Sequence, residues 1–167
     1  MEETFAKYIN VNGELMDLSR PQVMGILNVT PDSFYADSRK QAEEDIVNRV
    51  HQIIEEGGCI IDIGAYSSRP DAEDVSPEEE MKRLKHGLQV IRREFPDAIV
   101  SADTFRADVA RMCVEEYGTA IINDISAGDL DANMFSTVAK IESALHHDAH
   151  AGKSTKHAKE SALPASG

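Results

Sequence analysis

This sequence predicts an α/β fold built on a parallel sheet, and three observations support that class. Four short apolar runs alternate along the chain with segments of helical periodicity, which is the pattern of consecutive βα units. The runs are continuously apolar, as expected for parallel strands that are covered on both faces. Each run also has an Asp or Asn near its carboxyl end. The runs span residues 23–28, 59–64, 98–103 and 120–125.

A small β-hairpin is expected over residues 8–18, before the first of these units. Asn12-Gly13 is a preferred two-residue turn, because both residues adopt positive φ readily. Such a hairpin suits the open bottom of a barrel, which it would plug.

Capping residues and apolar periodicity predict four helices. The first spans about 40–56, with Ser38 as its cap and Gly57-Gly58 at its end. The second begins in a capping box, Ser76-Pro77-Glu78-Glu79, with Pro at the first helical position. The third spans about 105–117 and a fourth follows residue 130. The expected apolar faces are Ala42, Ile46, Val50 and Ile53; Met81, Leu84, Leu88 and Ile91; Phe105, Val109 and Cys113; and Met134, Val138 and Ile141.

Two architectures fit four βα units, a doubly wound sheet and a (β/α)₈ barrel. No Gly-x-Gly-x-x-Gly motif follows any strand, which argues against a dinucleotide-binding fold. Asn28, Asp62, Asp103 and Asn123 lie near the carboxyl ends of the strands, where barrel enzymes hold their chemistry. We therefore expect the barrel class, with about four βα units after the hairpin.

Composition excludes several functions and locations. The net charge of −13 argues against nucleic acid as a partner, since phosphate backbones require Lys and Arg. No apolar run approaches the ~20 residues of a membrane span, and the N-terminus lacks the features of a signal peptide. The two cysteines have no metal-ligand spacing and are expected to be reduced, as in a cytoplasmic protein.

The chain divides by composition near residue 140. Residues 1–140 carry the βα units, whereas residues 141–167 contain no aromatic residue and no strong apolar periodicity, which predicts a disordered tail. Three histidines in this tail, His146, His147 and His150, lack the acidic or Cys partner that would complete a metal site.

Polar side chains gather in the segments after the first two strands. Asn28 ends a buried strand, so it either caps its own turn or binds a ligand. Ser67, Ser68 and Arg69 form a donor cluster that suits an anion, although Arg69 has an alternative as a surface ion pair with a nearby acidic residue.

Asp103 and Asn123 end neighbouring strands. Together they offer a carboxylate and an amide, which either satisfy loop backbone groups or contact the edge of a nitrogen heterocycle. Asp62 is interpreted as an interior residue that is hydrogen-bonded to its neighbours.

Four segments together resemble the dihydropteroate synthase family: MGILNVTPDSF, IIDIGAYSSRP, VSADT and IINDI, in that order, over about residues 20–140. The resemblance implies a (β/α)₈ barrel that condenses 6-hydroxymethyl-7,8-dihydropterin diphosphate with 4-aminobenzoate, releases diphosphate and requires Mg²⁺. A pterin-binding methyltransferase relative is the alternative within this fold, and TPDSF followed by SSRP favours the synthase.

Residue roles follow from the resemblance where the motifs match. Asn28 corresponds to the residue that binds Mg²⁺ and diphosphate, and Ser68 and Arg69 correspond to anion contacts. The catalytic set is thus Asn28, Asp32, Ser68 and Arg69, the metal ligand is Asn28, and the substrate-binding set is Thr30, Phe34, Ser68, Arg69, Pro70, Asp103, Asn123 and Ile125. Ser68 stands where the family commonly has Thr, and it keeps the hydroxyl group.

The sequence after residue 140 departs from the family. An Asp-Pro-Gly pterin contact, a Ser-Arg-Lys stretch and a final Arg-x-His are expected there and are not found. We therefore expect a truncated chain with little activity alone, and a non-catalytic remnant or interaction module is the other class of function left open. Four strands without the remainder of a barrel leave open edges, which predicts self-association.

Overall fold

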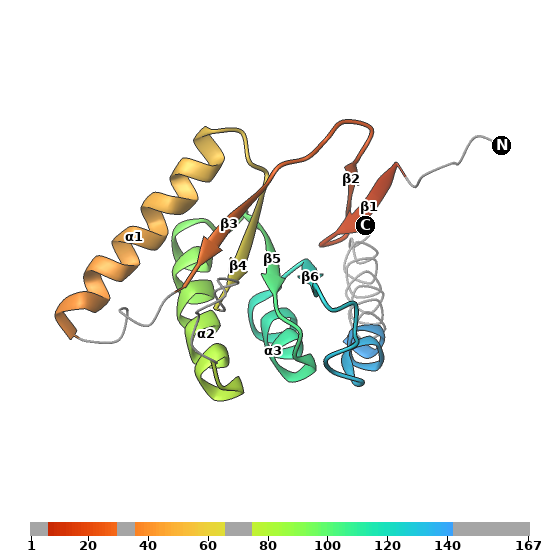
Figure 1. The fold of residues 1–167 in the computed structure, drawn as a ribbon. Helices are drawn as coiled ribbons and strands as arrows, with labels where there is room; N and C mark the ends of the chain where they lie inside the picture. The colour runs from red at the N-terminus through yellow and green to blue at the C-terminus, as the bar shows by residue number, and fades with distance from the viewer. Residues whose placement is uncertain (1–6, 30–35, 66–74, 142–167) are drawn as a thin grey trace, which may run out of the picture.

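The structure is a computed structural model that describes residues 7–29, 36–65 and 75–141. Strands and helices alternate along it, as predicted, after an amino-terminal hairpin (Figure 1). A further helical segment covers residues 134–141. The elements are β1 (Tyr8–Val11), β2 (Glu14–Asp17), β3 (Met24–Asn28), α1 (Ala36–Glu55), β4 (Ile60–Gly64), α2 (Pro77–Glu94), β5 (Ile99–Asp103), α3 (Ala107–Tyr117) and β6 (Ile121–Asn123).

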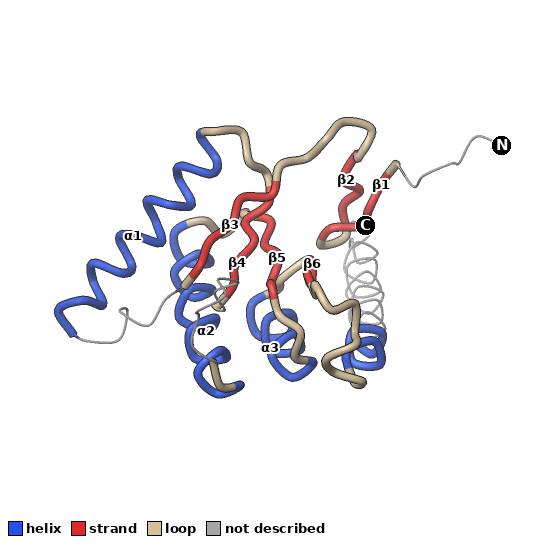
Figure 2. Tube along the Cα trace, in the orientation of Figure 1, coloured by secondary structure: helices blue, strands red, loops and turns tan. Residues whose placement is uncertain are grey.

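The main sheet is parallel and has the order β3-β4-β5-β6. This order follows the chain without the reversal that a doubly wound sheet has at its switch point, so the predicted barrel class is confirmed. Helices α1, α2 and α3 lie along one face of the sheet (Figure 2). The core lies between these two layers, where Leu27, Ile63 and Ala102 of the sheet are buried with Val50, Leu84, Leu88 and Ile91 of the helices.

Local signals in the sequence define most element boundaries. Asn12 and Gly13 both have positive φ and join β1 to β2 in the predicted hairpin. Ser76 caps α2, because its Oγ accepts a hydrogen bond from the backbone N–H of Glu79 at 3.2 Å. Gly118 ends α3 in the left-handed conformation, which a glycine adopts without a Cβ penalty.

Three boundaries differ from the predictions. α1 begins at Ala36, so Ser38, the predicted cap residue, lies inside the helix. Phe105 precedes α3 and does not belong to its apolar face. β6 ends at Asn123, so Ile125 lies beyond the strand.

The face of the sheet opposite the helices is only partly covered. Met24 and Ile26 of β3 point to this face and are exposed, Ile26 by 58%. Ile60 of β4 is buried on the same face. The hairpin joins the chain at the start of β3 and lies on the far side of the sheet from α1 (Figure 1).

Neither cysteine of the structure forms a disulfide. Cys113 is buried, and burial raises the pKa of its thiol to about 12, with further increases from Glu80 and Glu116. A thiol of that pKa stays protonated and unreactive at neutral pH. Among the helices that the structure describes, none is long and apolar enough to cross a membrane.

Arg92 connects α2 to the end of α3 and to the turn that precedes β5. Its guanidinium donates to the backbone oxygens of Tyr117 at 2.7 Å, Ala98 at 2.9 Å and Gly118 at 3.0 Å. Partial burial lowers the pKa of Arg92, and the group remains a cation. One side chain therefore satisfies three carbonyl groups at the ends of α3 and of the segment that precedes β5.

Replacing Arg92 with Met is expected to lower the free energy of unfolding by about 1–3 kcal/mol, because these carbonyls lose charged donors. Arg93→Met is the matched control, since Arg93 is exposed and pairs only with Glu43 and Glu94 among the residues described here. Its loss should change the free energy of unfolding much less, because solvent screens exposed ion pairs. Urea unfolding of both variants measures the difference, and equal losses would contradict the role of Arg92.

Candidate functional site

Four residues form one row across the carboxyl edge of the sheet. Parallel pairing places Asn28 opposite Gly64, Gly64 opposite Asp103, and Asp103 opposite Asn123. Residues paired in this way point to the same face, and here it is the face away from the helices. We call Asn28, Gly64, Asp103 and Asn123 the edge row.

Gly64 leaves space between the polar members of the edge row. A Cβ added at Gly64 would lie 3.4 Å from Asp103 Oδ2 and 3.6 Å from Asn28 Oδ1. Any longer side chain at this position would therefore extend between the carboxylate and the amide. The glycine, itself buried, places no side chain between the Asn28 amide and the Asp103 carboxylate.

A second polar layer lies directly beneath the edge row. Asp62 is paired with Ser101, and both are buried. Asn123 Nδ2 donates to Asp62 Oδ2 at 3.0 Å; because a carboxylate only accepts hydrogen bonds, this contact fixes which way the amide faces. Asp62 Oδ1 and Ser101 Oγ are buried without a partner among the residues that the structure describes.

Asp103 is a carboxylate in acidic surroundings. Partial burial raises its pKa above the ordinary value of 3.8, and repulsion from Asp62, Glu80 and Asp124 raises the pKa further. With the Asn123 amide nitrogen donating to Asp62, the amide oxygen remains an acceptor, on the residue paired with Asp103. The edge row therefore favours ligands that present N–H donors or positive charge.

The structure brings together part of the predicted site. Asn28, Asp103 and Asn123 share the edge row, as the strand ends predicted. Ile125 lies just beyond β6 and is 89% exposed, so it is available for contact with a ligand. Thr30, Asp32, Phe34, Ser68, Arg69 and Pro70 lie outside the described residues.

Asp62 and Glu80 contribute more to the geometry and electrostatics of the site than the sequence indicated. Asp62 is an interior residue with a hydrogen bond to a neighbouring side chain, as predicted, and this contact also orients Asn123. Glu80, which the sequence analysis does not single out, is buried in the first turn of α2 and acts electrostatically on Asp103. An acidic residue within a strand is the one available signal for Asp62. Glu80 precedes Leu84 by four residues and Leu88 by eight, so helical periodicity places it on the buried face of α2, unlike Glu78 and Glu79.

The donors at the edge row are consistent with Mg²⁺ only if a substrate supplies further oxygens. Among the described residues, no group of three or more His, Cys, Asp or Glu side chains could hold a metal ion. Asn28 offers one amide oxygen beside the space at Gly64. Mg²⁺ commonly takes one or two protein oxygens and completes its shell with water and phosphate, so this donor set fits a metal shared with a phosphorylated substrate.

A sequential parallel sheet with acceptor side chains along its carboxyl edge defines a barrel-type α/β enzyme, which binds its substrate at that edge. Comparison with known families agrees with this class. A family model described as "Pterin binding enzyme" matches residues 24–162. The chain belongs to this pterin-binding enzyme family.

Relatives of known function are folate-synthesis proteins. The mitochondrial folate synthesis bifunctional protein of Arabidopsis thaliana is 41% identical over 142 residues, which are 83% of this chain and 26% of that protein. The dihydropteroate synthase of Haemophilus influenzae is 39% identical over 130 residues, 78% of this chain and 46% of that protein.

A solved structure agrees with the sequence relatives. The Xanthomonas albilineans dihydropteroate synthase with 4-aminobenzoic acid has a TM-score of 0.68 and 33% identity, over 82% of this chain and 49% of that one. The chain thus spans between about a quarter and a half of the length of the relatives that it matches.

Replacing Asp103 with Asn is expected to stabilise the unliganded protein at pH 7 by a few tenths to about 1 kcal/mol, the range allowing for solvent screening. The raised pKa means that the folded state disfavours the carboxylate. The part of the wild-type stability that depends on protonated Asp103 is therefore lost as the pH rises from about 3.8 through the folded pKa of this residue.

Urea unfolding between pH 3 and 8 measures this effect. The gap between Asp103→Asn and the wild type should be absent at the lowest pH and constant near neutrality. A variant that is less stable than the wild type at pH 7 would contradict this electrostatic account.

Proposed function

We propose that this chain acts in dihydropteroate synthesis: it binds 6-hydroxymethyl-7,8-dihydropterin diphosphate and 4-aminobenzoate, which condense with release of diphosphate. The observation that carries the proposal is the edge row, in which Asp103 and Asn123 stand side by side. A pterin ring presents several N–H donors along one edge, and the Asp103 carboxylate and Asn123 amide oxygen are acceptors for them. Ile125 would pack against the ring.

The charges around the edge row support the same chemistry. Asp62, Asp103, Asp124 and Glu80 lie close enough to interact electrostatically, and together they favour positive charge on a ligand. When the bond from the pterin methylene to the diphosphate oxygen breaks, its electrons leave with the oxygen and the pterin becomes cationic. Fixed negative groups stabilise that charge where it develops. The amine of 4-aminobenzoate then forms the new C–N bond and loses a proton.

The remaining roles are assigned through the matched motifs. Asn28 would bind the metal and diphosphate, with Ser68 and Arg69 as further anion contacts. Mg²⁺, when bound, would supply charge neutralisation at the diphosphate oxygens. Thr30, Asp32 and Phe34 would act in the first loop, and Arg69 and Pro70 in contact with 4-aminobenzoate.

Partners and location complete the proposal. The net charge of −13 supports small-molecule substrates without nucleic acid or membrane partners. We propose a cytoplasmic location, which needs testing by cell fractionation because relatives in Arabidopsis thaliana include a mitochondrial protein.

Activity of the 167-residue chain alone tests the proposal most broadly. Each missing charge-assisted contact of the family is worth roughly 2–4 kcal/mol at the transition state. Three such losses imply dihydropteroate formation about four or more decades slower than in an intact synthase. The measurement is product formation from both substrates with Mg²⁺. Turnover within tenfold of an intact synthase would contradict the expected loss of activity, whereas substrate binding without turnover would favour the non-catalytic module.

Replacing Asn28 with Ala should remove Mg²⁺-dependent binding of diphosphate, because the edge row loses the amide oxygen that is proposed to bind the metal. Calorimetric titration with inorganic diphosphate, with and without Mg²⁺, measures the loss, which we expect to be at least tenfold in affinity. Asn48→Ala is the control, since Asn48 is exposed on α1 away from the edge row. Unchanged binding by Asn28→Ala would argue against the assigned role.

We also propose that the open face of the sheet drives self-association with a second copy of the chain. Two features support this proposal. Met24 and Ile26 of β3 are exposed, and β3 and β6 each have one edge without a partner strand in the part of the chain that the structure describes. Sedimentation velocity at micromolar concentration should detect dimers or larger species, and Ile26→Lys should shift them toward monomer. A monodisperse wild-type monomer would refute the proposal.

A further inference from the structure

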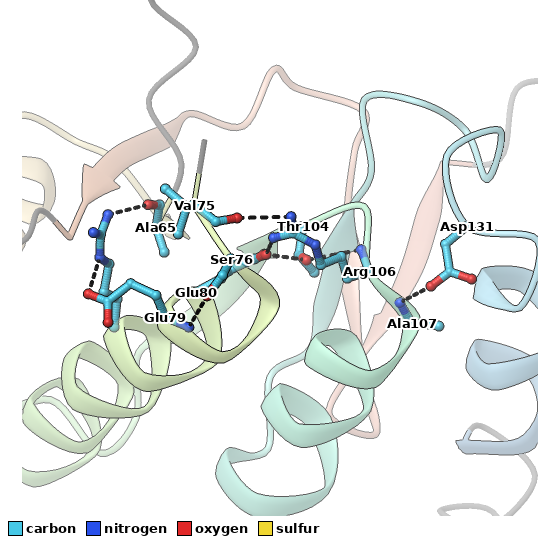
Figure 3. Close-up of polar contacts among 10 residues, drawn as sticks. Ala65, Val75, Ser76, Glu79, Glu80, Thr104, Arg106, Ala107 and Asp131 are labelled. Atoms are coloured by element: carbon cyan, nitrogen blue, oxygen red, sulfur yellow. Dashed lines mark hydrogen bonds and ion pairs between the residues drawn. The ribbon is translucent and has the colours of Figure 1, made fainter. Parts of the chain in front are cut away.

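We propose that the buried carboxylate of Glu80 is a positioning residue for the pterin site, because through Thr104 and Arg106 it fixes the peptide that follows Asp103. The inference rests on the proposed function for its ligand and goes beyond it in assigning this residue. Figure 3 shows Glu80 of α2, Thr104 and Arg106 joined in one set of contacts.

Glu80 is almost completely enclosed, with 1% of its surface exposed. One carboxylate oxygen, Oε1, accepts a hydrogen bond from the Thr104 hydroxyl at 2.6 Å. The other, Oε2, is ion-paired with Arg106 Nη1. An isolated charge would be strongly disfavoured at this depth, so both contacts are required to hold the carboxylate there.

Thr104 transmits this constraint to the edge row. Its hydroxyl also accepts a hydrogen bond from the backbone N–H of Arg106 at 3.2 Å. Its own backbone N–H donates to the carbonyl oxygen of Asn123 at 3.1 Å. Since Thr104 directly follows Asp103, the peptides that carry both proposed pterin contacts are held relative to Glu80.

Arg106 extends the connection to the start of α2. Its Nη2 donates to the carbonyl oxygen of Val75 at 2.9 Å, next to the cap residue Ser76. Arg83, also from α2, donates to the carbonyl oxygen of Ala65 at 3.3 Å, just after β4. The first two turns of α2 thus contact the backbone just after β4 through Arg83, and the side chains of Thr104 and Arg106 after β5 through Glu80.

A purely structural role explains this arrangement less well. Replacing a buried ion pair by apolar residues of similar volume is often neutral or stabilising, so such a pair is weak evidence for stability. Arg106 stands at the cap position of α3 but its side chain does not cap that helix. Asp131 does so instead, accepting from the backbone N–H of Ala107 at 2.8 Å. Arg106 is thereby left to engage Glu80 and Val75.

Three variants and a control test the proposal in the full chain. Thr104→Val removes the hydroxyl at nearly constant volume, Thr104→Ser retains it, and Glu80→Gln removes the charge. Glu78→Gln is the matched control, because Glu78 is an exposed acidic residue in the same turn of α2. The readouts are calorimetric affinity for 6-hydroxymethylpterin and hydrogen exchange of individual backbone amides by NMR.

We expect Glu80→Gln and Thr104→Val to bind 6-hydroxymethylpterin at least tenfold more weakly, with Thr104→Ser and Glu78→Gln within about threefold of the wild type. In Thr104→Val the Arg106 amide should exchange at least tenfold faster, since its acceptor is gone, while the amides of Ile63 and Val100 keep their rates. Acceleration spread through the whole sheet, or Thr104→Val with unchanged affinity and exchange, would overturn the proposal.

The affinity measurement and the hydrogen-exchange measurement together separate this inference from the proposed function. A wild-type chain that fails to bind 6-hydroxymethylpterin would refute the proposed function. The exchange of the Arg106 amide would then decide by itself whether Thr104 and Glu80 fix the peptide, with local acceleration supporting it and unchanged exchange refuting it.

Discussion

Parallel pairing between β3, β4, β5 and β6 determines which side chains share the carboxyl edge of the sheet. A shift of one residue in any strand would turn its edge side chain to the helical face, where the apolar core lies. The apolar residues of the strands therefore fix the register, and the register in turn aligns Asn28, Gly64, Asp103 and Asn123. Packing on one face of the sheet thus assembles a polar site on the other.

The electrostatics of this site oppose the stability of the unliganded protein. Asp62 keeps one buried oxygen without a partner among the described residues, and the pKa of Asp103 is raised by burial and by its acidic neighbours. A ligand that brings N–H donors or positive charge would give the Asp62 oxygen a partner and would stabilise the charged form of Asp103. The same acidic groups would repel diphosphate, which agrees with the proposed assignment of the anion, made through the matched motifs, to Asn28 with Mg²⁺ and to Ser68 and Arg69.

The sequence predicted the order of strands and helices, the hairpin, the cap of α2 and the polar strand ends. These features depend on local chemistry: turn glycines, capping hydroxyls and apolar periodicity. The start of α1 and the short β6 were less well predicted, because fraying ends depend on weak preferences. The role of Asp62 depends on its contact with Asn123, 61 positions later in the chain, and that of Glu80 on its contact with Thr104, 24 positions later. No local pattern encodes these partners.

The central claim is that the edge row binds a pterin, and mapping of amide chemical shifts tests it most directly. Titration of the ¹⁵N-labelled chain with 6-hydroxymethylpterin should perturb the amides of Gly64, Asp103, Thr104 and Asn123 and leave those on the outer surface of α2 unchanged. Perturbations confined to the groove between α1 and α2, lined by Glu43, Met81 and His86, would contradict the account. No perturbation at millimolar ligand would contradict it as well.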